Sequence, residues 1–181
     1  MKVGVLAVQG AFAEMASFFR AKGAEIQEIR QASDFRHGGI DMLALPGGES
    51  TVQGKLLKDL GLFYPLKDAI DGGLPVFATC AGLILLAERI EGEETAWFGS
   101  LPVAVRRNAY GRQFGSFTAT GCWDGHPNVP MTFIRAPSIT ETAPDVEILS
   151  SYNDLPTSVR WRSITAFTWH PELGDPKAFP I

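Results

Sequence analysis

The chain has 181 residues and a formal net charge of −4; 45% of its residues are hydrophobic and 20% are charged. Such a composition is typical of a globular protein with a sizeable core, and it excludes an intrinsically disordered chain. Like charges form no block that would attract a nucleic acid, and no apolar run approaches the roughly 18 residues of a membrane helix. Cys80 and Cys122 indicate no disulfide framework, so we expect a cytoplasmic protein without nucleic-acid or membrane partners, in which Cys122 is structural.

Short apolar segments alternate with amphipathic segments through the first half of the chain. The expected strands lie at 3–8, 25–30, 41–45 and from Pro75 onward. The expected helices lie around 12–21, 56–60 and 66–70. This alternation predicts an α/β fold, a three-layer sandwich with a mostly parallel central sheet covered on both faces. Residues 1–181 are expected to form a single domain.

After Gly92 the sequence becomes rich in strand-like runs that are separated by Gly, Pro and Asn. Strands are expected at 101–105, 114–118 and 131–134, and a closing hairpin at 157–162 and 163–168. No linker or repeat marks a second domain. We therefore expect this part to lie at or across the edge of the main sheet.

Cys80 lies where an apolar strand changes into an apolar helix, which we expect to run on to Glu88 and Arg89. Its small neighbours, among them Ala81 and Gly82, let a substrate and another backbone come close. This pattern is typical of a nucleophile elbow, in which the N-terminal N–H groups of the helix favour a thiolate. The alternative is an inert, buried cysteine, because free cysteine is among the most buried residue types.

His170 and Glu172 follow the last expected strand. A catalytic cysteine needs a base, since a thiol with an ordinary pKa of about 8.5 is mostly protonated at neutral pH. Glu172 can reach back to orient His170 because Pro171 stiffens the backbone between them. Alone, a His-x-Glu sequence is more often a surface turn, but together with Cys80 it gives the order of a Cys–His–Glu triad. His37 and His126 are interpreted as solvated loop residues, and no metal-ligand spacing is present, so we expect no metal.

The glycine-rich turn at 46–51 suits an oxyanion hole, with one N–H from this turn and another from Ala81. The alternative is an ordinary strand-to-helix turn with Ser50 as its N-cap, and both can hold together. In an open α/β sheet, ligands bind beyond the carboxyl ends of the strands. Gln9-Gly10, this turn and Cys80 all follow strands, so they are expected to meet at one edge of the sheet.

Six stretches occur in an order that resembles a known family. They are Val8-Gln9-Gly10-Ala11-Phe12, Leu45-Pro46-Gly47-Gly48-Glu49-Ser50-Thr51, Thr79-Cys80-Ala81-Gly82-Leu83-Ile84-Leu85-Leu86, Arg107-Asn108-Ala109-Tyr110-Gly111-Arg112-Gln113, Phe133-Ile134-Arg135-Ala136-Pro137 and His170-Pro171-Glu172-Leu173. Over nearly its whole length the chain resembles the glutaminase subunits of pyridoxal 5′-phosphate synthase, in the class I (triad) glutamine amidotransferase superfamily. The resemblance implies a flavodoxin-like sheet, hydrolysis of glutamine to glutamate and ammonia, no cofactor, and a separate synthase subunit that takes up the ammonia.

The resemblance also implies roles for individual residues. Cys80 would be the nucleophile, His170 the proton carrier and Glu172 its orienting partner. Gly48 and Ala81 would donate the oxyanion hole. The residues implied to grip the amino-acid end of L-glutamine are Gly48, Glu49, Ser50, Arg107, Ile134 and Arg135.

Three features depart from the family pattern. Ala78 stands where glycine is usual, and Ala109 where serine is usual. The tail at 174–181 contains two prolines where the family has a short helix, so we expect no regular helix, looser packing behind Glu172 and a mobile tail. Two alternatives to a glutaminase therefore stay open, another cysteine hydrolase or peptidase on this scaffold and a non-catalytic binding subunit.

Overall fold

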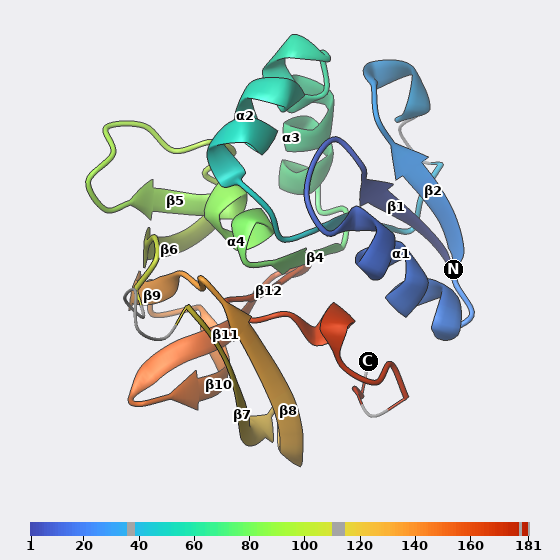
Figure 1. Ribbon diagram of the computed structural model, residues 1–181. Helices are drawn as coiled ribbons and strands as arrows, with labels where there is room; N and C mark the ends of the chain where they lie inside the picture. Colours follow the sequence, from blue (N-terminus) through green and yellow to red (C-terminus); the bar gives the residue numbers. More distant parts are fainter. Residues whose placement is uncertain (36–38, 110–114, 178, 181) are drawn as a thin grey trace.

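A seven-stranded sheet forms the middle layer of the protein (Figure 1). The structure is a computed structural model that describes residues 1–35, 39–109, 115–177 and 179–180. Its strands are β1 (Lys2–Leu6), β2 (Glu25–Ile29), β3 (Met42–Leu45), β4 (Val76–Thr79), β5 (Ala87–Ile90), β6 (Leu101–Arg106), β7 (Ser116–Trp123), β8 (His126–Ile134), β9 (Ser138–Thr142), β10 (Glu147–Tyr152), β11 (Leu155–Trp161) and β12 (Ile164–Phe167). Its helices are α1 (Phe12–Ala21), α2 (Ser50–Asp59), α3 (Phe63–Asp71) and α4 (Ala81–Leu86), with short 3₁₀ turns at Ala32–Asp34 and Pro171–Leu173.

The sheet has the strand order β10-β11-β12-β4-β3-β1-β2, and its strands from β12 to β2 are parallel. The strands β4 and β12, which lead to the two halves of the predicted triad, are neighbours: Phe167 of β12 pairs with Thr79 of β4. Parallel neighbours end at the same edge of a sheet, so the residues that follow them come close together. The predicted α/β fold with a mostly parallel sheet is confirmed.

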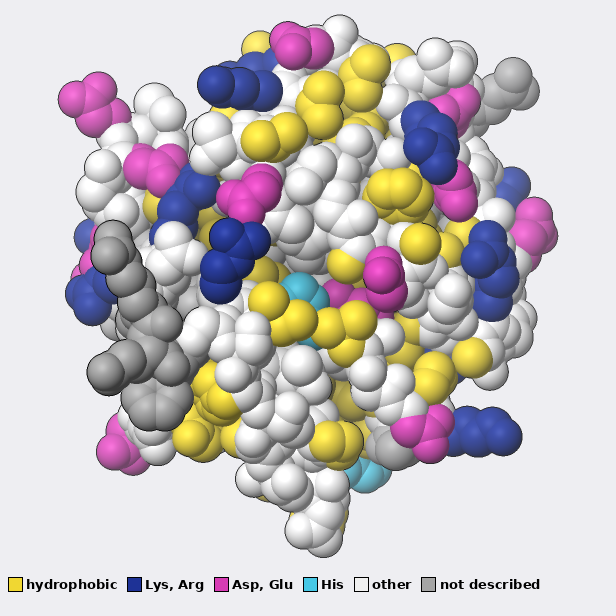
Figure 2. All heavy atoms as spheres, viewed as in Figure 1, with side chains coloured by type: hydrophobic (Ala, Val, Ile, Leu, Met, Phe, Trp, Pro, Cys, Tyr) yellow, Lys and Arg dark blue, Asp and Glu magenta, His cyan; other side chains and the backbone are white. Residues whose placement is uncertain are grey.

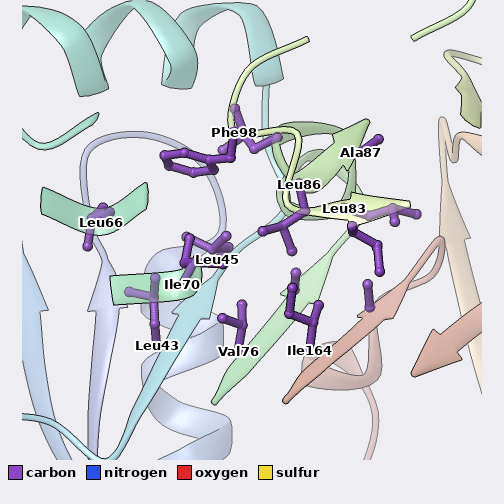
Figure 3. Packing of buried hydrophobic residues seen from close by; sticks show 14 of the residues in the cluster. Leu43, Leu45, Leu66, Ile70, Val76, Leu83, Leu86, Ala87, Phe98 and Ile164 are labelled. Atoms are coloured by element: carbon purple, nitrogen blue, oxygen red, sulfur yellow. The ribbon is translucent and has the colours of Figure 1, made fainter. Parts of the chain in front are cut away.

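Each face of the sheet carries its own hydrophobic layer. Leu43 and Leu45 of β3 pack on the side of α2, α3 and α4, where Figure 3 shows them beside Leu66, Ile70 and Leu83. Ala44, between them in the sequence, faces the other side together with the aromatic residues of α1 and β12. This alternation follows from the two-residue period of a strand. No helix among the described residues is long and apolar enough to cross a membrane.

The second half of the chain is placed partly as predicted. Strands β11 and β12 form the predicted closing hairpin and extend the main sheet with β10. Strands β5, β6 and β9 make a separate three-stranded sheet, and β7 with β8 forms a two-stranded ribbon. The predicted strand at 114–118 is described only from Gly115 onward, and β7 begins at Ser116.

One element boundary was predicted wrongly. Helix α4 ends at Leu86, and Glu88 and Arg89 belong to strand β5. All six residues of α4 are buried, so the helix is a short internal segment without a solvent face that charged residues could continue. Arg89 forms an ion pair with Glu141 on the solvent side of the small sheet.

No described residue of the C-terminal tail belongs to a regular helix, in agreement with the prediction, but the expectation of looser packing is wrong at Phe179. After the 3₁₀ turn Pro171–Leu173, Phe179 is only 5% exposed. Its ring lies 4.5 Å from Trp123 and 5.7 Å from Trp169, centroid to centroid, and its carbonyl oxygen accepts a 2.6 Å hydrogen bond from the Lys22 ammonium. One buried aromatic ring therefore anchors the tail against the layer that lies behind His170.

Candidate active site

Cys80 occupies a strained turn between β4 and α4. Its backbone has φ 48° and ψ −100°, a conformation that non-glycine residues rarely adopt. The Cys80 N–H donates a 2.8 Å hydrogen bond to the Phe167 carbonyl of β12, which holds the turn against the sheet. A Cβ atom on Gly82 would collide with the Leu45 carbonyl, so α4 can lie this close to β3 only with glycine there. This is the predicted nucleophile elbow.

His170 and Glu172 form a buried hydrogen-bonded pair beyond the end of β12. His170 Nδ1 lies 2.8 Å from Glu172 Oε1, and the side chains are 6% and 0% exposed. Because the carboxylate can only accept, Nδ1 carries the proton and Nε2 is the nitrogen left for the thiol. Pro171 occupies the first turn of the 3₁₀ helix, in agreement with the predicted stiff link between the two residues.

The surroundings of His170 change the pKa of its imidazole. Burial disfavours the imidazolium and by itself lowers its pKa. Hydrogen bonds with the Cys80 side chain and with Glu172, together with the negative charge of both partners, outweigh burial and raise the pKa of His170 to about 10. A protonated imidazole beside the sulfur stabilises a thiolate. Cys80, which lies 90 residues before His170 in the sequence, thus shares a pocket wall with the buried His170–Glu172 pair.

Thr79 is a further partner of this pair that sequence reasoning missed. Its hydroxyl donates a 2.9 Å hydrogen bond to Glu172 Oε1, the same oxygen that faces His170. Thr79 is fully buried, and it precedes the nucleophile in the strand that pairs with β12. Its position directly before Cys80 was the available signal, but a threonine in a buried strand has no local pattern that points to this contact.

The glycine-rich turn packs directly against the imidazole. A Cβ atom on Gly47 would collide with the His170 ring, so only glycine leaves room for the base. The Gly47 carbonyl accepts a 2.9 Å hydrogen bond from the Ala11 N–H. In a trans peptide the N–H of the next residue, Gly48, points in the direction opposite to the Gly47 carbonyl. The alternative of Ser50 as the N-cap is wrong, because Ser50 is the first residue of α2, Glu49 is the N-cap, and no side chain makes a capping hydrogen bond.

Two arginines lie at the rim and are already paired with acidic side chains. Arg107 Nε lies 2.7 Å from Glu93 Oε1, and its Nη1 donates a 3.0 Å hydrogen bond to Thr51 Oγ1. Arg135 Nη2 lies 2.9 Å from Glu49 Oε1, in an exposed ion pair. Ligand binding at the rim would therefore involve exchange of these partners.

A pocket of about 320 Å³ joins these groups, at the low end of the size range for small-molecule sites. It is lined by Ala11, Glu14, Gly47, Gly48, Glu49, Ser50, Cys80, Ile84, Arg107, Asn108, Ile134, Arg135, His170 and Leu173. The wall thus contains all the predicted site residues except Glu172, which stands behind His170, and Ala81, which follows the nucleophile. Figure 2 shows this face, with an imidazole partly visible near its middle among acidic and hydrophobic side chains.

The other candidate residues lie elsewhere. Cys122 is exposed on β7 and does not line the pocket. His126 is exposed, as predicted, but its predicted place in a loop is wrong because it begins strand β8. His37 lies outside the described residues, as does the part of the Arg107–Gln113 stretch from Tyr110 onward. Among the described residues no group of His, Cys, Asp and Glu could hold a metal ion.

Comparison with known proteins gives one consistent result. Residues 5–179 match the model of the SNO glutamine amidotransferase family. The chain is 51% identical over 176 residues to pyridoxal 5′-phosphate synthase subunit PdxT of Desulfitobacterium hafniense (strain DSM 10664 / DCB-2), covering 97% of this chain and 88% of the relative. It is 46% identical over 177 residues to the protein of the same name from Streptococcus pneumoniae (strain CGSP14), covering 97% and 91%.

A solved structure agrees with these relatives. A crystal structure described as a glutamine amidotransferase superimposes with a TM-score of 0.90 at 39% identity, covering 97% of this chain and 93% of that chain. A more distant neighbour, PurLQS from Thermotoga maritima, has a TM-score of 0.70 at 14% identity, over 94% and 87% of the two chains, and supports the fold alone.

Proposed function

Because the chain belongs to the SNO glutamine amidotransferase family, we propose that it hydrolyses L-glutamine to L-glutamate and ammonia and passes the ammonia to the synthase subunit of a pyridoxal 5′-phosphate synthase. The observation that carries the proposal is the buried, hydrogen-bonded pair of His170 and Glu172, with His170 and Cys80 at the wall of one small pocket. A pocket of this size suits one free amino acid, whereas a peptidase would need an open cleft.

The reaction follows from the three side chains. The Cys80 thiolate attacks the side-chain amide carbon of glutamine, and the tetrahedral intermediate collapses to a thioester as His170 gives its proton to the leaving ammonia. His170 then takes a proton from a water molecule, whose oxygen attacks the thioester carbon. The carbon–sulfur bond breaks, glutamate leaves, and the proton stays with the Cys80–His170 pair, which regenerates the starting state. Glu172 keeps the imidazole in the tautomer and orientation that both steps need.

Backbone N–H groups of Gly48 and Ala81 are proposed to hold the oxyanion in both steps. The hydrogen bond from Ala11 to the Gly47 carbonyl fixes this peptide group, and Gly48 lines the same pocket as Cys80, which supports this role. Ala81 is the first residue of α4, where backbone N–H groups have no partner within the helix. Such donors act on charge that develops only during the reaction.

The substrate-gripping residues are proposed from their chemistry and their place in the pocket. Glutamine carries a carboxylate and an ammonium at one end. Arg107 offers a guanidinium to the carboxylate, and Glu49 offers a carboxylate to the ammonium. Ser50 and the backbone at Ile134 and Arg135 complete this end of the pocket.

Docking to the synthase subunit is proposed to activate the glutaminase, in a cytoplasmic complex that needs neither metal nor cofactor in this subunit. The relatives in D. hafniense and S. pneumoniae are named as subunits of the synthase, which supports the assignment of this partner. Glutamate release from glutamine, measured with and without the synthase subunit, tests the proposal. We expect turnover in the complex, and its absence there would contradict a glutaminase.

Covalent labelling separates the alternatives. A chloroketone analogue of glutamine should alkylate Cys80 stoichiometrically, and the exposed Cys122 is the internal control for unspecific alkylation. Labelling of Cys80 only by peptide-type reagents would favour a peptidase. No labelling of Cys80, even with the synthase subunit bound, would favour a non-catalytic binding subunit.

A further inference from the structure

Gln53 is a polar side chain where the pattern of its helix calls for an apolar one. It lies on the buried face of α2, with Ser50, Gly54 and Leu57, and is 0% exposed. Burying a carboxamide is unfavourable unless hydrogen bonds compensate for the lost water. The neighbouring Val52 is 44% exposed, so the burial of Gln53 is specific to its position on the helix.

The Gln53 amide group links two turns that come from different strands. Its Nε2 donates to the Gln9 carbonyl at 3.0 Å and to the Pro46 carbonyl at 3.3 Å. Gln9 lies in the turn after β1, and Pro46 directly follows β3. An amide nitrogen has two protons, so both are used.

The two turns are also joined by their own contacts. Gln9 Oε1 accepts a 2.9 Å hydrogen bond from the Glu49 N–H, and the Ala11 N–H donates to the Gly47 carbonyl at 2.9 Å. A Cβ atom placed on Gly48 would lie 2.9 Å from Gln53 Nε2, so the amide packs directly beneath this glycine. Gln53 thus supports the turn from the side of α2.

We propose that Gln53 is a positioning residue that fixes the Gly48 N–H in the orientation needed to bind the oxyanion. The inference rests on the proposed function, because it assigns Gln53 to that reaction through Gly48. Without its amide the buried Pro46 carbonyl and the partly buried Gln9 carbonyl would lose this donor, and the turn would gain alternatives to its present geometry. An oxyanion exists only on the reaction path, so misplacing its donor lowers kcat and leaves KM nearly unchanged.

Gln53→Met tests this inference, because methionine has a similar length and no hydrogen-bond donor. In the complex with the synthase subunit we expect kcat for glutamate release to fall about tenfold or more, less than the ~10²–10³-fold of a lost oxyanion donor, with KM within about twofold. The matched control is Gln27→Met, since Gln27 also donates to a backbone carbonyl, that of Asp34, but lies on β2 away from the pocket. We expect the control to keep the kcat of the wild type.

Alkylation of Cys80 by iodoacetamide distinguishes a positioning role from a structural one. If Gln53 only supported the fold of the site, its loss would also slow this alkylation. This displacement at a saturated carbon forms no oxyanion, so its rate at Cys80 should be the same in wild type and Gln53→Met. Reduced alkylation together with reduced kcat would overturn the proposal, because the nucleophile itself would then be disturbed. Equal kcat in an active wild type and in Gln53→Met would overturn it as well.

Gln53→Asn covers the case in which the methionine variant does not fold. Asparagine keeps the carboxamide but is one methylene shorter, so it cannot reach both carbonyls, and we expect the same loss of kcat. Failure of both variants to fold would overturn the proposal in favour of a purely structural role. A wild-type complex that releases no glutamate would instead overturn the proposed function, and with it this inference.

Discussion

The two ends of the pocket are built in opposite ways. At the inner end, His170 and Glu172 are 6% and 0% exposed and are bonded to each other. At the rim, Arg135 and Glu49 are 69% and 54% exposed, in a pair that water can replace. The contrast indicates that the groups proposed for bond making are fixed before a ligand arrives, whereas the groups proposed for recognition must exchange partners. Changes at the inner end should therefore reduce kcat, and changes at the rim should raise KM.

The largest effect is expected at the sulfur. Cys80→Ala removes the nucleophile, so glutamate release by the complex should fall by at least about 10³-fold. A steady-state assay with purified subunits measures this loss. Turnover retained in Cys80→Ala would refute the assignment of Cys80 as the nucleophile. Cys122→Ala changes the exposed cysteine and is the control, which should not affect turnover.

The base and its partner come next, and they should differ from each other. His170→Ala removes the proton carrier, and we expect kcat to fall by about 10³-fold. Glu172→Ala leaves the imidazole in place but removes the group that orients it. The fall of kcat in this variant should therefore be at least about tenfold smaller than in His170→Ala. Parallel kinetics on the two variant complexes give the order, and an equal or larger loss in Glu172→Ala would contradict it.

The hydroxyl of Thr79 should have a moderate effect. Thr79→Val keeps the shape of the side chain but removes the donor to Glu172. A hydrogen bond to a charged group is worth about 1.5–3 kcal/mol, so we expect kcat to fall about tenfold. Thr79→Ser keeps the hydroxyl and is the matched control. If valine and serine behaved alike, the hydrogen bond would have no part in orienting the carboxylate.

A smaller effect is expected from a change at the rim of the pocket, and it should appear in KM and not in kcat. Arg107→Lys keeps the charge but loses the planar fork that matches a carboxylate, so KM for glutamine should rise by about three- to tenfold with kcat unchanged. The neighbouring Arg106 offers a control, since its Nε lies 2.7 Å from Glu91 and it does not line the pocket. If Arg106→Lys raised KM equally, Arg107 would lose its role in binding.

The last prediction concerns stability as a function of pH and not a reaction rate. The pKa of His170 is raised from 6.5 to about 10 in the folded protein, so folding favours its protonated form. This contribution is fully present below pH 6.5 and is lost as the pH rises through about 10. The free energy of unfolding should therefore decline less over this range in His170→Ala than in the wild type. Denaturant titrations at several pH values measure both slopes, and identical slopes would contradict a stabilising imidazolium.

The parts of the molecule differ in how well the sequence predicts them. The strands before Cys80 are apolar runs bounded by turn residues. Each end that was predicted for β1 to β4 lies within two residues of the observed end. The grouping of Cys80 with the His170–Glu172 pair could be predicted because an elbow cysteine and a His-x-Glu sequence each leave a local pattern. The helix predicted to reach Arg89 failed because a six-residue buried helix that leads directly into a strand has no boundary signal at Leu86.

The supporting contacts could not be predicted. Thr79 meets Glu172 across 93 residues, and Gln53 meets Gln9 across 44. The helical spacing from Leu57 places Gln53 on the buried face of α2, but nothing local indicates which carbonyl groups its amide meets. The pairing of Arg107 with Glu93 likewise depends on how β6 lies beside the loop after β5. Such roles arise only when the fold brings distant segments together.

The contact between Gly47 and the His170 ring limits how this enzyme could be redesigned. The loop that is proposed to receive the negative oxygen is also the wall that keeps the proton carrier in place. A laboratory selection for a bulkier amide substrate could not widen this loop with larger residues without displacing the imidazole. New specificities on this scaffold are therefore more accessible through the charged rim than through the loop beside the base.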